Sequence, residues 1–130
     1  MLLDYVHNLD HACSIKSGSA LSGTTPVNGT AKAFADAIGP VAAVFAVGDA
    51  ANSPSTQAHV CKLQESANGS TGWTDVTGAT ATITANATSA LLQGVRTQPY
   101  VRGQVTPAFT GGSSPTNTCS AVVFAQKGEV

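Results

Sequence analysis

Apolar and polar side chains alternate with a period of two through the middle of the chain. Residues 60–65 read V-C-K-L-Q-E and residues 73–76 read W-T-D-V, with the connection N-G-S-T-G at 68–72. A period of two is typical of a β-strand, because successive side chains point to opposite faces. The two glycines allow positive φ angles, and Asn and Ser hydrogen-bond to their own backbone, so the connection is a turn. The pattern predicts a β-hairpin over residues 62–76.

Further apolar stretches predict strands at 41–47, 79–84, 91–95, 100–106 and 119–125, with turn residues between them. Alternation within the first of these indicates a strand buried heavily on one face. No convincing long helix interrupts the series, and 130 residues suit one domain with its own core. We therefore expect an all-β protein, a single β-sandwich of jelly-roll or immunoglobulin-like type over residues 30–130.

The first 29 residues do not follow this pattern. In residues 2–15, Leu3, Val6, Leu9 and Ala12 hint at helical spacing, but no cap or C-terminal glycine frames them, so this stretch is expected to be extended or partly helical. Residues 17–29 are rich in Gly, Ser, Thr and Asn. We expect an N-terminal arm and linker over residues 1–29 that contacts a neighbouring subunit or a larger shell, or that instead protects an edge strand of its own domain. The apolar residues predicted to make the contact are Leu2, Leu3, Tyr5, Val6 and Leu9.

Composition removes several classes of function. Charged residues are only 10% of the chain and the formal net charge is -1, so no basic surface for nucleic acid or anionic lipid is expected. The most apolar run, 41–47, is far shorter than the roughly 20 residues that span a bilayer. No signal-peptide pattern opens the sequence, which predicts assembly in a cytoplasm. Three cysteines without metal-ligand spacing favour reduced thiols over a disulfide framework.

The candidate catalytic and metal-binding residues do not form a complete site. His7 and His11 are four residues apart and lie near Asp4 and Asp10, but a stable metal site usually needs three or four ligands. His59 precedes a strand and is expected at the surface. Neither a nucleophile elbow nor a phosphate-binding or dinucleotide-binding glycine motif is present. We expect no catalytic residue, no metal and no cofactor.

The hairpin and the strands beside it supply the expected core. Trp73 is interpreted as a core residue, with a sugar-stacking platform as the alternative. Arg102 and Glu65 are expected to form a cross-strand or surface ion pair. The predicted hairpin and core residues are Trp73, Leu63, Val76, Tyr100 and Val101.

A series of short motifs resembles a family of phage proteins. The motifs are V-x-x-V-F-x-V-G at 41–48, K-L-Q-E-S at 62–66, N-G-S at 68–70, W-T-D-V at 73–76, P-Y-V-R at 99–102 and A-V-V at 121–123. In this order they resemble small β-sandwich proteins encoded among the head genes of tailed bacteriophages, over roughly residues 29–125. The resemblance implies a capsid decoration (cement) or minor head protein on the exterior of the virion's capsid. It also implies two partners, the major capsid protein and further copies of the chain, often as a homotrimer.

Two other functions remain open at this point. W-T-D-V followed by P-Y-V-R also resembles discoidin-type sandwiches, which implies a carbohydrate-binding module. A tail or baseplate structural component would share the same sandwich and differ only in its partner. The sequence does not separate the three.

Overall fold

The computed structural model describes residues 9–34 and 39–126, and these form strands joined by turns and loops. No helix occurs in the described ranges, and so none that could cross a membrane. The strands are β1 Leu9–Ser22, β2 Val27–Asn28, β3 Lys32–Ala33, β4 Gly39–Val47, β5 Thr56–Gln57, β6 His59–Ser66, β7 Thr74–Ile83, β8 Ser89–Arg96, β9 Tyr100–Thr106, β10 Phe109–Thr110 and β11 Thr116–Gln126.

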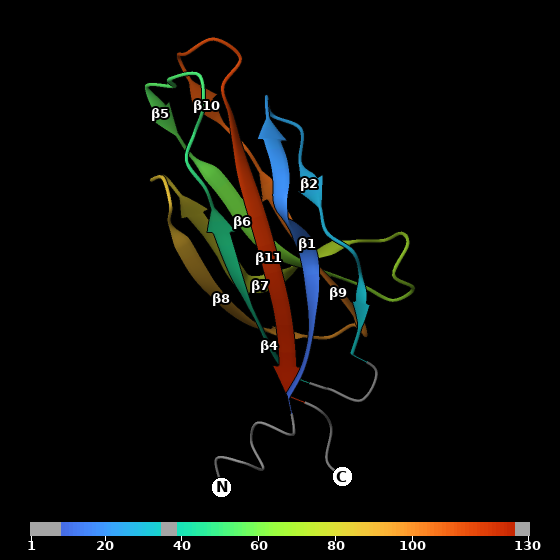
Figure 1. Cartoon of the computed structure of the whole chain (residues 1–130). Coiled ribbons are helices and arrows are strands. Elements are labelled where there is room, and N and C mark those ends of the chain that lie inside the picture. Colours follow the sequence, from blue (N-terminus) through green and yellow to red (C-terminus); the bar gives the residue numbers. More distant parts are fainter. Residues whose placement is uncertain (1–8, 35–38, 127–130) are drawn as a thin grey trace, which may run out of the picture.

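Two antiparallel sheets pack face to face (Figure 1). The first has the order β1-β11-β4-β8, and the second has the order β2-β9-β6-β7 with β3 also paired to β9. A short β10-β5 ribbon lies at one end of the sandwich. The prediction of an all-β sandwich is confirmed, and so is the β6–β7 hairpin, in which Glu65 pairs with Thr74.

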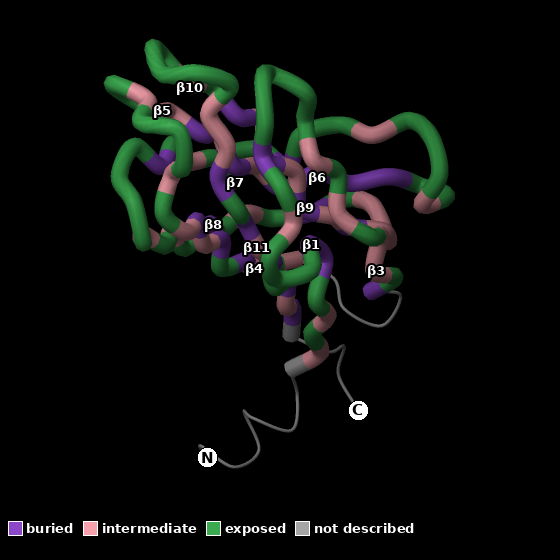
Figure 2. The backbone as a smooth tube through the Cα atoms, turned by 45° about the horizontal axis from the view of Figure 1, so that its top comes forward, coloured by how far each residue is buried: buried purple, intermediate pink, exposed green. Residues whose placement is uncertain are grey.

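The core lies between the two sheets, where every second residue of β4, β9 and β11 points inward. Buried segments follow the strands and the end loops are mostly exposed (Figure 2). Phe45 of the first sheet and Leu63 and Val101 of the second sheet are all fully buried. Gly103 is required next to Phe45, because a Cβ there would lie 2.9 Å from Cζ of Phe45. The predicted core residues Leu63, Val76 and Val101 all lie in this core.

Strand β1 corrects the predicted arm. It pairs with β11 from Leu9, opposite Gln126, to Ser22, opposite Thr116, and its Ile15 is buried in the core. The predicted boundary at residue 29 is therefore wrong for the described residues, because residues 9–29 belong to the sandwich. Register shifts on both sides of Ile15 break the alternation of this strand, so no period of two marked it. Leu9 begins β1, while Leu2, Leu3, Tyr5 and Val6 lie outside the described residues.

Ser14 connects β1 to the second sheet. Its hydroxyl accepts a hydrogen bond from the N–H of Gly103 on β9 at 2.9 Å and donates one to the carbonyl of Thr30 at 3.0 Å. The N–H of Thr30 in turn donates to the carbonyl of Ser14 at 2.7 Å. Strand β1 thus pairs with one sheet and is hydrogen-bonded to the other, which closes this side of the sandwich.

Candidate interaction surfaces

The outer side of the first sheet carries an exposed apolar surface. Val122 pairs with Val44, and Val44 pairs with Leu91, so three aliphatic side chains lie side by side on β11, β4 and β8. Their exposed fractions are 40%, 41% and 59%, and Val95 at the β8 edge is 63% exposed. We call the surface the apolar face and define it by Cys13, Pro40, Ala42, Val44, Leu91, Val95, Val122 and Phe124.

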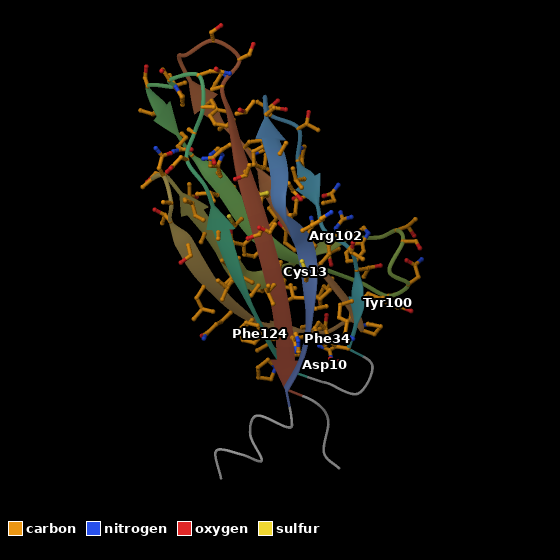
Figure 3. All side chains as sticks on the ribbon, viewed as in Figure 1. Asp10, Cys13, Phe34, Tyr100, Arg102 and Phe124 are labelled. Carbon is orange, nitrogen blue, oxygen red and sulfur yellow. The ribbon has the colours of Figure 1, made fainter. Side chains whose placement is uncertain are left out.

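The apolar face carries no formal charge on β11, β4 and β8. The outward residues of β4 (Pro40 to Ala46), of β8 (Ser89 to Val95) and of β11 (Ser120 to Phe124) include no Lys, Arg, Asp or Glu. β1 adds His11 and Cys13 beside Phe124 and Val122 (Figure 3). The solvated side of an antiparallel sheet is normally polar, and a contiguous exposed apolar patch typically marks an interaction site. Covering this face would remove apolar area from water without desolvating a charge.

The outer side of the second sheet is polar. Arg102 donates from Nε and Nη2 to Oε1 of Gln64 at 3.0 and 2.9 Å, and Gln64 donates to Oδ1 of Asp75 at 3.1 Å. Lys62 reaches the other oxygen of Asp75 at 3.2 Å. The guanidinium of Arg102 lies 4.2 Å from the ring centre of Trp73. We call these five residues the polar face.

Hydrogen bonding sets the charge state of the polar face. The hydrogen bond from Gln64 is the largest cause that lowers the pKa of Asp75. Burial opposes it, and the hydrogen bond and charge of Lys62 lower the pKa further. Burial lowers the pKa of Arg102. The polar face therefore offers one carboxylate, two cations and an indole ring, which can hydrogen-bond to and stack on a polar ligand.

Trp73 is not a core residue, contrary to the prediction. It lies in the β6–β7 connection, is half-buried, and stacks with Arg102 on the outer side of the sheet. Tyr100 is also half-buried, and its ring packs against Gly69 of the same connection, where a Cβ would lie only 2.6 Å from the ring. The alternation predicted strands β6 and β9 but did not decide on which side a residue in the turn packs.

The predicted ion pair between Arg102 and Glu65 is also wrong. Arg102 is aligned with Gln64, whereas Glu65 is aligned with Val101, and neighbours along a strand point to opposite faces. Glu65 is only 6% exposed and points inward. One of its carboxylate oxygens accepts hydrogen bonds from the N–H groups of Thr97 at 2.6 Å and Gln98 at 3.0 Å.

Arg96 completes the contacts around Glu65. It is 6% exposed and donates to the carbonyls of Gln98, at 2.8 Å, and of Phe34. Burial lowers the pKa of Arg96, and the charge of Glu65 acts in the opposite direction. Glu65 thus accepts hydrogen bonds from N–H groups of the β8–β9 turn, and Arg96 donates one to a carbonyl of the same turn. The sequence did not indicate this structural role for Arg96.

His59 is fully buried, although a surface position was expected. Its Nε2 lies 2.8 Å from Oε1 of Gln57, its ring meets the edge of Phe109 at 4.9 Å between centres, and Nδ1 has no partner. Gln57 also accepts a hydrogen bond from Asn117 at 2.9 Å. The β5–β10 ribbon brings Gln57 and Phe109 over the ring. Burial lowers the pKa of His59.

The burial of His59 predicts a loss of stability in mild acid. The unfolded chain binds a proton near the ordinary pKa of about 6.5, before the folded chain does, so the stability is complete above that pH and falls below it. We expect a decrease of at most about 1.4 kcal/mol per pH unit below pH 6.5. Urea unfolding between pH 8 and 5 measures it, and His59→Gln should flatten the slope. An unchanged slope in that variant would contradict the assignment.

The described residues do not assemble a metal site. No group of three or more His, Cys, Asp and Glu lies together within them. His11 lies on strand β1, so it is not on a helix face that it could share with His7 four residues away. His7 lies outside the described residues. Burial raises the pKa of Cys61 to about 12 and that of Cys119 to about 11, which keeps both as unreactive thiols.

Comparison with known proteins gives structural likeness without sequence relatives. No family model matches the chain, and no curated protein is similar to it. The PBSX exported protein XepA is similar in structure, with a TM-score of 0.62 at 14% identity over 93% of this chain and 38% of its own.

Two further structures are similar. The infectious bursal disease virus Gx strain structure has a TM-score of 0.53 at 13% identity over 94% of this chain and 33% of its own. The CBM22-1-GH10 modules of Clostridium thermocellum xylanase 10B, complexed with xylohexaose, have a TM-score of 0.52 at 8% identity over 95% and 27%. The chain has a β-sandwich fold. It spans well under half the length of these structures, and at such identities the likeness concerns the fold alone.

Proposed function

We propose that the chain is a structural component of a tailed-phage particle that decorates the capsid exterior. The observation that carries the proposal is the apolar face, an exposed sheet surface whose central residues Val44, Leu91 and Val122 are uncharged and lie in register. A surface of this kind suits contact with another protein and requires no reactive group. The partners are the major capsid protein and further copies of this chain in a symmetric arrangement such as a trimer.

Two lines of support stand beside the apolar face. The motifs between residues 41 and 123 resemble those of phage head proteins, and the fold is similar to structures from PBSX and from a virus. The same fold also occurs in xylanase modules, so the fold leaves open which partner is bound. The charge-free chemistry of the face favours a protein surface over a sugar, because sugars need hydrogen-bonding groups.

Co-sedimentation with purified phage heads that lack the protein tests the proposal. The wild-type chain should bind saturably. Leu91→Glu should lose at least tenfold in affinity, because it places a charge within the apolar contact, next to Val44. Thr82→Glu, at a position that is also exposed, on β7 of the other sheet, is the matched control and should bind normally. Binding to tails alone would make the chain a tail or baseplate component, and binding to neither would overturn the proposal.

Carbohydrate binding is the second candidate, favoured by the polar face. Trp73 is accessible in part and is surrounded by Arg102, Gln64 and Asp75, which offer donors and acceptors for hydroxyl groups. A glycan array separates the two candidates. Binding that is lost in Trp73→Ala and kept in Leu91→Glu would support the carbohydrate function. If the chain binds no glycan on the array, the carbohydrate function is excluded.

A further inference from the structure

We propose that residues 1–8 of one copy cover the apolar face of a neighbouring copy, so that the chains assemble by exchange of this segment. The inference deepens the proposed function, because it names the occupant of the face that serves assembly. It combines two sets of apolar side chains, those of the apolar face and those of residues 1–8.

The segment has the composition of a buried element. Residues 1–8 read M-L-L-D-Y-V-H-N and include Leu2, Leu3, Tyr5 and Val6, with Asp4 as the one carboxylate. Such a density of large apolar side chains is atypical of a solvated tail. The apolar face offers side chains of the same kind, and its central strands hold no Asp or Glu that would repel Asp4.

The length of the segment fits the width of the sheet. Eight extended residues reach about 26 Å. The four strands β1, β11, β4 and β8 are spaced about 4.8 Å apart, so their axes span about 14 Å. One segment is therefore long enough to cross the whole face, from Cys13 on β1 to Leu91 on β8.

The point where the segment joins the sheet favours a neighbour over the same copy. Leu9 is still paired with Gln126 at the end of the first sheet, at the lower end of β1 in Figure 1. To reach its own apolar face the chain would have to reverse immediately before Leu9. Residues 1–8 contain no glycine or proline for such a reversal, and only Asp4 and Asn8 are turn-prone. A segment that instead continued away from β1 would reach another copy, and reciprocal exchange would close a symmetric oligomer.

Two complementary variants test the exchange. A chain lacking residues 2–8 keeps the receiving face, and full-length Leu91→Glu keeps the segment but loses the face. We expect each variant alone to sediment as a monomer at concentrations where the wild type is oligomeric. Mixed together, they should form a complex, because each supplies what the other lacks. Substitution of Leu2, Leu3 and Val6 by Ser in the full-length chain should reproduce the deletion, and Thr82→Glu should behave as wild type.

Cys13 reports directly whether the face is covered. It is exposed on the apolar face opposite Val122, whereas Cys61 and Cys119 are buried. With a thiol reagent we expect at least tenfold slower labelling of Cys13 in the assembled wild type than in the deletion variant. Dilution of the wild type should restore fast labelling. Circular dichroism and melting of each variant establish that it is folded.

Three outcomes would overturn the inference. An oligomer that persists in the deletion variant would mean that two apolar faces pack on each other. Slow Cys13 labelling in a monomeric wild type, independent of dilution, would mean that the segment covers its own face. A monomer with fast labelling at all concentrations would mean that the segment covers neither. Binding to phage heads is measured separately, so failure of the exchange and failure of the decoration function are distinguishable.

Discussion

Replacement of Glu65 by Ala is expected to lower the free energy of unfolding by about 3–5 kcal/mol, the cost of removing one partner from a buried charged cluster. The substitution leaves the N–H groups of Thr97 and Gln98 without their acceptor. It also leaves the buried guanidinium of Arg96 without the nearby negative charge. The loss therefore combines unsatisfied backbone donors with an uncompensated cation.

Urea unfolding at pH 7 measures this effect, and two variants calibrate it. Glu65→Gln keeps the size and one acceptor oxygen, so its loss should be intermediate. Asp75→Ala removes a carboxylate whose side chain is 57% exposed, and should cost no more than about 1 kcal/mol. Equal losses in Glu65→Ala and Asp75→Ala would show that Glu65 does not stabilise the β8–β9 turn.

Phe45→Ala is expected to cost about 3–5 kcal/mol, as for other buried large aromatic side chains. Phe45 is fully buried and fills the space that Gly103 leaves open on the opposite sheet. The loss should exceed that of Trp73→Ala, which removes a half-buried ring and its contact with Arg102, worth about 1 kcal/mol. Thermal and urea unfolding of both variants provide the comparison. If Trp73→Ala were as costly as Phe45→Ala, Trp73 would have a core role after all.

Strands with strict alternation were predictable from the sequence. Val101 and Val105 on β9 point inward, while Arg102 and Gln104 between them point outward, as their spacing indicates. The β6–β7 turn was predictable because Gly69 and Gly72 take positive φ angles there. In each case the signal is local, since it depends on neighbours within a few residues.

The remaining features depend on partners far away in the sequence. β1 was missed because its bulges disrupt the period of two, and its pairing with β11 joins opposite ends of the chain. His59 is buried only because Phe109 and Gln57 cover it. The apolar face was not predictable for another reason. Val44, Leu91 and Val122 come from three separate strands. The sequence of each strand on its own resembles that of an ordinary strand that is partly buried on both sides.

The position of β11 has a consequence for the order in which the molecule forms. It lies between β1 and β4, yet it is synthesised after every other described strand. During translation the first sheet therefore cannot be completed until β11 has been synthesised. Until β11 pairs with them, both β1 and β4 expose unpaired backbone edges. Contacts between such distant segments slow folding, and open edges favour aggregation. Ribosome-bound chains stopped before residue 116 should remain accessible to protease and to chaperones, and the sandwich should become protected only after β11 has emerged.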